Sequence, residues 1–217
     1  MIKKEIVDNE TDSYTMAQFL NEAIRRNGGP ISIASGYFNV EGFAKVRDSL
    51  WEAAKRDDFN LRLLFGRETT SKKETAQSIE PSDLAETSLI SELDNLTIDE
   101  QSAKLVDDLI NFLKLDKVQV KKNPNRFTHA KCYIFNDSVV VGSSNFTKAG
   151  LATNIELNAV LYQPSAQQQV REWFDRRWSE GEDAKDELIQ ILEDSKFGLP
   201  LEPYKMYMKF LYEYYKP

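Results

Sequence analysis

The stretch RFTHAKCYIFNDSVVVGSSNFTKAG, residues 126–150, contains the single histidine of this 217-residue chain, His129. Alternation along HAKCYIF predicts a strand that carries His129 and Lys131 on one face. An Asn-Asp pair after this run predicts a tight hairpin turn, and SVVVG predicts the returning strand. The hairpin therefore places the Gly-Ser-Ser-Asn turn, residues 142–145, beside the histidine.

This arrangement would bring together His129, Lys131, Ser143 and Asn145. An ammonium group with hydroxyl, amide and backbone donors is suited to hold a phosphate group. An imidazole that faces a phosphate suggests nucleophilic attack at phosphorus, with the other groups stabilising the transition state. Each feature also has a simpler explanation, because a lone strand histidine is usually packed or solvated and GSSN alone is often a turn or a helix cap.

The combined pattern resembles the HKD motif of the phospholipase D superfamily. The matching residues are His129, Lys131, Gly142, Ser143, Asn145 and Glu156. The resemblance implies that His129 forms a covalent phosphohistidine, that Lys131 and Asn145 are catalytic phosphate ligands, and that Glu156 orients the histidine. It also implies Ser143 and Ser144 as further substrate-binding residues. A lone H-x-K would be a weak signal, but its combination with GSxN and a later glutamate is specific.

One motif position departs from the family pattern. An aspartate is expected five residues after the lysine, but this chain has Asn136 there and Asp137 next. The glycine also comes one residue early, which indicates a one-residue deletion in the hairpin. Since the motif aspartate is usually structural, we expect the site to tolerate this change.

Composition indicates a soluble, cytoplasmic protein, since 41% of the residues are hydrophobic and 29% are charged. The N-terminal residues have no apolar signal core, and no apolar run has the length of a membrane span. A single cysteine excludes an internal disulfide. No His/Asp/Glu cluster has metal-ligand spacing, so neither a metal nor another cofactor is expected.

The net charge of −7 requires any nucleic-acid contact to come from a local basic patch. Lys121, Lys122 and Arg126 are the candidates for DNA binding. A solvated edge strand with charged gatekeeper residues explains them equally well.

Helical and strand periodicities alternate through the first part of the chain, which predicts parallel strands in an α/β fold. The predicted strands lie in 30–38, 59–66, 117–122, 128–135, 138–144 and 155–162; the predicted helices lie in 13–29, 40–57, 99–115, 164–178 and 184–194. Together with the resemblance, this predicts a phospholipase D-like mixed central sheet flanked by helices on both faces. We expect a domain over 1–180 and a helical C-terminal extension over 181–217.

One histidine cannot both attack phosphorus and protonate the leaving oxygen. We therefore expect a homodimer with a shared site, in which His129 of each subunit faces the other across a two-fold axis. The resemblance implies a metal-independent DNA nuclease attached to a helicase in a repair or restriction protein, with the helicase-like domain missing from this chain. The alternatives are a catalytically silent DNA-binding or dimerisation module and, less favoured, a lipid phosphodiesterase.

Overall fold

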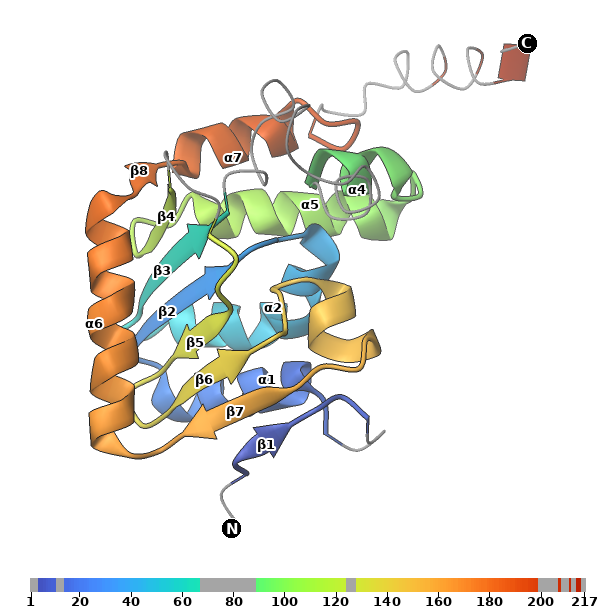
Figure 1. Ribbon diagram of the computed structural model, residues 1–217. Helices are drawn as coiled ribbons and strands as arrows, with labels where there is room; N and C mark the ends of the chain where they lie inside the picture. The colour runs from blue at the N-terminus through green and yellow to red at the C-terminus, as the bar shows by residue number, and fades with distance from the viewer. Residues whose placement is uncertain are drawn as a thin grey trace, which may run out of the picture.

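An eight-stranded mixed sheet forms the centre of the protein, in the order β1-β7-β6-β5-β2-β3-β4-β8 (Figure 1). The structure is a computed structural model that describes residues 4–10, 14–66, 89–123 and 128–198, with Tyr207, Leu211, Tyr214 and Tyr215. The strands are β1 Ile6–Val7, β2 Pro30–Ser35, β3 Asn60–Phe65, β4 Val118–Lys122, β5 Cys132–Ile134, β6 Val139–Gly142, β7 Asn158–Leu161 and β8 Glu182–Asp183. The helices are α1 Met16–Asn27, α2 Val40–Ala54, α4 Leu89–Asn95, α5 Glu100–Leu113, the π-helix η2 Ala149–Thr153, α6 Pro164–Glu180 and α7 Lys185–Glu193.

Strands β2, β3 and β4 are parallel, as the alternating periodicity predicts, and the remaining pairs are antiparallel. The helix between β2 and β3 starts where the Asn39 side chain accepts the Gly42 N–H at 2.7 Å. Similar chemistry starts α1, where Thr15 and Gln18 form a capping box. Local capping and apolar periodicity therefore agree over this βαβ unit.

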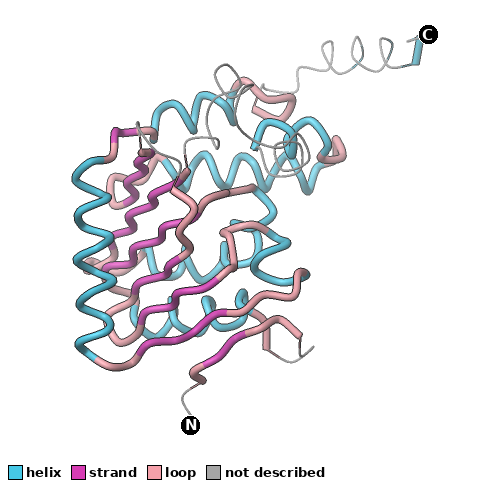
Figure 2. The backbone as a smooth tube through the Cα atoms, in the orientation of Figure 1, coloured by secondary structure: helices cyan, strands magenta, loops and turns pink. Residues whose placement is uncertain are grey.

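Helices cover both faces of the sheet, which confirms the predicted fold class (Figure 2). Helices α1, α2, α5 and α7 contribute buried residues to the main core on one face. Helix α6 packs Phe174 on the opposite face, against Ala34, Leu64 and Cys132 of the strands. Cys132 is a free, buried thiol that serves as a small core side chain.

The hairpin forms as predicted, but its first strand is shorter than the sequence suggests. Strand β5 begins at Cys132, so His129 and Lys131 lie in the segment that leads into it. The Phe135 N–H donates to the Ser138 carbonyl at 2.9 Å, which closes a two-residue loop. In this loop Asp137 forms an ion pair with Arg26 at 2.7 Å. The hairpin turn is thereby anchored to α1.

The described part of the predicted C-terminal extension packs on the sheet domain. Leu188 and Leu192 of α7 are fully buried and belong to the main core. The boundary at residue 180 remains a prediction. No helix among the described residues has both the length and the apolar character needed to cross a membrane.

Candidate active site

The predicted catalytic residues gather at one edge of the sheet. The carboxyl ends of the parallel strands β2, β3 and β4 lie at this edge, and so do the end of β6 and the start of β5, because these pair antiparallel. A bridge between Phe38 and Phe146 joins the segment after β2 to the segment after β6. Ligands of open α/β sheets commonly bind at the carboxyl ends of parallel strands.

His129 and Asn145 meet beside the backbone of Gly36. A Cβ atom added at Gly36 would lie 3.4 Å from His129 Cδ2 and 3.2 Å from Asn145 Oδ1. The imidazole is exposed at the surface, yet partial burial and the neighbouring Lys131 lower its pKa below the usual 6.5. The ring is therefore mostly neutral at pH 7, which is the form in which imidazole is a nucleophile.

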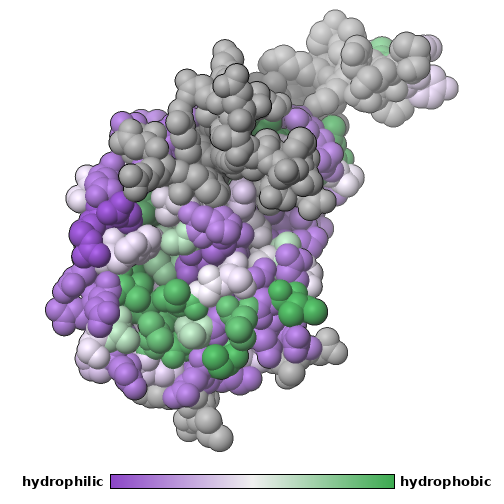
Figure 3. Space-filling view, in the orientation of Figure 1, coloured by the Kyte–Doolittle hydropathy of each residue, from purple (hydrophilic) through white to green (hydrophobic). Residues whose placement is uncertain are grey.

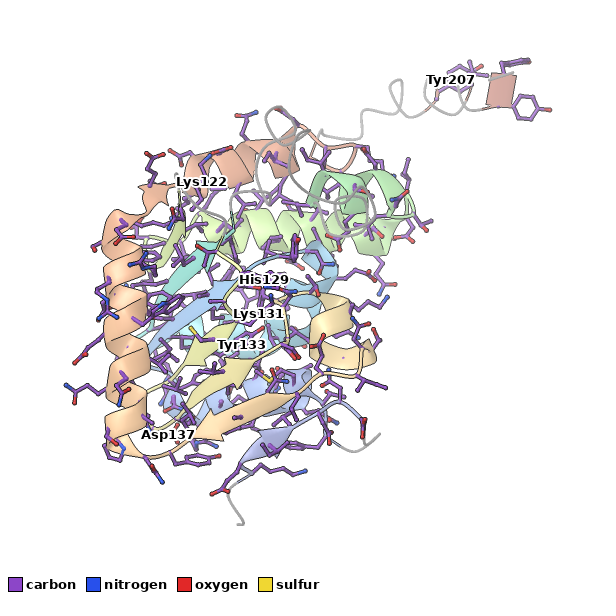
Figure 4. All side chains as sticks on the ribbon, viewed as in Figure 1. Lys122, His129, Lys131, Tyr133, Asp137 and Tyr207 are labelled. Atoms are coloured by element: carbon purple, nitrogen blue, oxygen red, sulfur yellow. The ribbon has the colours of Figure 1, made fainter. Side chains whose placement is uncertain are left out.

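Lys131 lies next to His129 in a more enclosed position. Its side chain is 7% exposed, and its Nζ donates to the His129 carbonyl oxygen at 2.8 Å. Burial lowers the pKa of Lys131 to about 8, and the charge of Glu156 opposes this decrease. Figure 4 shows His129 and Lys131 in the segment that enters β5, followed by Tyr133 on the strand itself. The ammonium group is charged at pH 7 and poorly solvated, so an anion would be a favourable partner.

Asn145 is held by residues from the end of β2. Its Oδ1 accepts the Tyr37 N–H at 3.2 Å and lies 3.4 Å from Ser35 Oγ. Ser35 ends β2, and Tyr37 and Phe38 follow it in the segment that leads to α2. Phe38 packs in the core, between Phe65 and Phe146. Ser35 was not among the predicted site residues, and its position at the end of a strand is the local signal that could have indicated a contact with the site.

Glu156 lies next to Ser143 at the start of the segment before β7. The Ser143 hydroxyl donates to the Glu156 carboxylate and accepts the Leu157 N–H at 3.0 Å. Glu156 also acts on Lys131 through its charge. These contacts give Glu156 a described link to Ser143 and Lys131, while its predicted role of orienting His129 remains a prediction.

Ser144 is not part of this cluster. It is fully buried, and its hydroxyl accepts from Asn158 Nδ2 at 2.9 Å. Residue 142 must be a glycine for the same reason, because a Cβ at Gly142 would lie 2.3 Å from Asn158 Oδ1. Ser144 thus stabilises the contact between β7 and the turn. Its buried side chain does not face the cluster, where a substrate-binding residue was expected.

The predicted basic patch is placed only in part. Lys122 forms an ion pair with Glu187 of α7, and Lys121 donates to the Trp178 carbonyl at 3.1 Å, with its Nζ 5.2 Å from the indole centroid. Strand β4 is three strands from β5, which corresponds to roughly 14 Å at the usual strand spacing. Arg126 lies outside the described residues.

Asp137, the residue after the altered motif position, lies far from the cluster. Figure 4 shows Asp137 at the opposite end of the hairpin from His129. Its hydrogen bonds with Arg26, Ser138 and Asn27 hold the pKa of its carboxyl below the usual value, although burial opposes them. Asp137 therefore stabilises the hairpin turn. Among the residues that the structure describes, no group of three or more His, Cys, Asp or Glu side chains is arranged to hold a metal ion.

A neutral histidine, a buried lysine and an oriented amide at the edge of a mixed α/β sheet define a site suited to phosphate esters. The chain belongs to the family described as cardiolipin synthase, PLD-like domain, whose profile matches residues 19–178, well over half of the sequence. Curated protein sequences gave no significant match.

Solved structures show the same fold at low sequence identity. Nuc from Salmonella typhimurium, a phospholipase D family member, is 18% identical over 82% of this chain and 95% of its own, with a TM-score of 0.54. Phosphatidylserine synthase from Haemophilus influenzae Rd KW20 is 10% identical over 97% of this chain and 45% of its own, with a TM-score of 0.58. At these identities the two matches show the fold of the chain, which agrees with its membership of the PLD-like family.

Proposed function

We propose that this protein is a metal-independent phosphodiesterase that cleaves DNA through a covalent intermediate on His129. The observation that carries the proposal is the convergence of the His129 ring and the Asn145 amide on Gly36, with Lys131 buried alongside. A neutral nucleophile next to an ammonium group and an amide provides attack and charge stabilisation without a metal.

The reaction would take two displacements. In the first, a nitrogen of His129 bonds to phosphorus, and the bond from phosphorus to the leaving oxygen breaks with its electron pair on that oxygen. Lys131 and Asn145 would neutralise charge on the non-bridging oxygens. In the second, water attacks phosphorus, the bond to the histidine nitrogen breaks, and the phosphate product leaves. Glu156 would support both steps by keeping Ser143 oriented and Lys131 charged.

Turnover of bis(p-nitrophenyl) phosphate in EDTA tests this chemistry directly. We expect the wild-type protein to release p-nitrophenol with chelator present and the His129→Ala variant to fall to background while its thermal unfolding stays cooperative. Asp137→Asn is a matched control, because that carboxylate lies in the same hairpin but at its other end. Activity that disappears with EDTA and returns with Mg²⁺ would exclude the mechanism.

A substrate panel then separates DNA from the other candidates. Single-stranded and duplex oligonucleotides should be cut, and vesicles of phosphatidylcholine or cardiolipin should release no headgroup. Cleavage of lipid in place of DNA would favour a lipid phosphodiesterase. DNA binding without turnover of any diester would favour a silent module of a larger, helicase-linked protein.

The leaving oxygen requires a proton donor, and we propose that a second copy of the chain supplies it. The chain has one histidine, so a two-fold dimer with both His129 side chains in one pocket provides the nucleophile and the acid together. Once the first bond is broken, the same acid would become the base that activates water. Lys131 and Asn145 of both subunits would line this pocket.

An exposed apolar strip beside the site supports this dimer. Val141 and Ile6 lie on the face of the sheet that carries α6, and the register of β6, β7 and β1 aligns both of them with Ala159. Leu157 is two residues before Ala159, on the same face, and is 65% exposed. Figure 3 shows apolar residues gathered on this face of the molecule. Exposed apolar patches mark protein–protein or membrane interaction sites, and an interface between two chains is the use that the proposed dimer requires.

Mixing wild type with His129→Ala under conditions of subunit exchange tests the shared site. A composite pocket lacks one imidazole in every heterodimer, so activity should fall well below the fraction of wild-type chains. A strictly proportional decrease would show independent sites.

A further inference from the structure

The Ser35–Gly36–Tyr37 turn at the end of β2 contacts two of the proposed catalytic side chains. Ser35 is fully buried, and its hydroxyl donates to the Tyr37 carbonyl at 2.6 Å while it accepts the Phe146 N–H at 2.8 Å. A hydroxyl has one hydrogen, which the short bond to Tyr37 occupies. The 3.4 Å separation between Ser35 Oγ and Asn145 Oδ1 is therefore a packing contact.

The direct partner of Asn145 is the backbone of Tyr37. The Tyr37 N–H lies 3.2 Å from Oδ1, and because an N–H is a donor it must face the amide oxygen. The NH₂ group of Asn145 lies in the same amide plane and then points away from the Tyr37 N–H. An amide held in this orientation presents donors to a ligand, as a phosphate oxygen requires.

Gly36 sets the distance between this amide and the nucleophile. The His129 ring and Asn145 Oδ1 lie against the same backbone residue, and a methyl group there would be 3.4 Å and 3.2 Å from them. The separation from Asn145 Oδ1 is tight for a carbon atom, so the amide would have to move by a few tenths of an ångström, while the methyl group would be in van der Waals contact with the His129 ring. The absence of a side chain at residue 36 lets both groups approach the same point.

We infer that this turn is the positioning element of the site: Ser35 fixes the Tyr37 backbone that orients the Asn145 amide, and Gly36 sets the spacing of that amide from His129. The inference rests on the proposed phosphodiesterase function. Ser35 is a positioning residue, because its hydroxyl acts through Tyr37 and Asn145.

A double-mutant cycle between Ser35→Ala and Asn145→Ala tests the inference in EDTA with bis(p-nitrophenyl) phosphate. Loss of one preorganised donor commonly lowers kcat by about 10²–10³-fold, so an amide that loses its orientation should lower kcat by about tenfold or more, with KM little changed. In the Asn145→Ala background, Ser35→Ala should have no further effect, because the group that it orients is absent.

Ser49→Ala is the matched control. Ser49 is also a fully buried serine, and its hydroxyl donates to Asn21 between α2 and α1. It should lower thermal stability in a similar way and leave kcat unchanged. If Ser35→Ala does not fold, Gly36→Ala tests the turn without removing a hydrogen bond. We expect this variant to lower kcat several-fold, and the decrease should be smaller when Asn145 is already alanine.

The outcomes separate the two proposals. Equal losses from Ser35→Ala in both backgrounds, or unchanged kcat, would overturn the positioning role while the phosphodiesterase function stands. A wild-type protein that turns over no diester, and whose side-chain amide NMR signals do not respond to inorganic phosphate, would overturn the function and the inference together.

Discussion

Deprotonation of the buried Lys131 should cause activity to fall at alkaline pH, and replacing this lysine by arginine should remove that fall. Burial lowers the pKa of Lys131 to about 8, from a usual value near 10.5. Since one pKa unit corresponds to about 1.4 kcal/mol, burial destabilises the charged form by about 3 kcal/mol. The proposed mechanism needs this charge, so the wild-type protein should lose kcat/KM as the pH rises through about 8. Arginine stays protonated throughout this range.

The assay is kcat/KM for bis(p-nitrophenyl) phosphate between pH 5 and pH 10. This parameter reports pKa values of the free enzyme. The p-nitrophenolate ion leaves without a proton, so a leaving-group acid adds no alkaline limb of its own. On the acid side, activity should decrease as His129 becomes protonated, below pH 6.5 because its pKa is lowered. Lys131→Arg should have a lower kcat/KM at pH 7, because the planar guanidinium group differs in shape from an ammonium group. Its kcat/KM should then stay constant up to pH 10.

Two results would refute this reasoning. A wild-type alkaline limb near pH 10 would show that Lys131 is not desolvated in solution. A limb that stays at about pH 8 in Lys131→Arg would assign it to another group. Glu156→Gln provides an independent check, because the charge of Glu156 raises the pKa of Lys131. The limb should therefore move below pH 8 in that variant.

Three further predictions concern other parts of the molecule. Burial raises the pKa of Glu92 to about 7, so between about pH 4.5 and 7 the folded state binds its proton more tightly than the unfolded chain, and the free energy of unfolding falls as pH rises. Between pH 5 and pH 8, chemical denaturation should therefore show the free energy of unfolding of Glu92→Gln increasing relative to that of the wild type by up to about 3 kcal/mol. Neutralising Lys121 and Lys122 should reduce the slope of log K against log salt concentration for duplex DNA binding by about 0.9 for each lost phosphate contact. An unchanged slope would show that these lysines contact α6 and α7 and do not bind DNA. Leu157→Glu should shift sedimentation toward monomer and lower DNA cleavage, whereas Ile98→Glu, at a similarly exposed residue away from the strip, should do neither.

The sheet and its main helices could be predicted because apolar periodicity and local capping agree along most of the chain. The strands β1 and β8 could not, since each has two residues and neither shows a period. The early part of β5 was predicted wrongly for a specific reason. Alternation continues through His129 and Lys131, but the Lys131 ammonium bonds to the His129 carbonyl and the ladder begins only at Cys132.

The candidate site could be predicted in identity but only partly in geometry. The spacing of histidine, lysine and asparagine indicated which residues gather at the hairpin. It could not distinguish two adjacent serines, because the choice depends on Asn158, whose side chain engages Ser144 and leaves Ser143 to Glu156. The contribution of Ser35 acts through the contact between the Tyr37 N–H and Asn145 Oδ1, residues 108 positions apart, which no local pattern encodes.

Binding of a phosphodiester anion and protonation of the site should be coupled, because the same burial governs both. Burial lowers the pKa of His129 and of Lys131. A bound anion favours the charged form of each group and would raise both values. At pH 7 the lysine is mostly charged and can pair with the anion without taking up a proton. The histidine, whose pKa is lowered, is mostly neutral before the anion binds and can act as the nucleophile. Near pH 8 the enzyme must take up a proton as the anion binds, and affinity there depends on pH even though the substrate itself does not titrate.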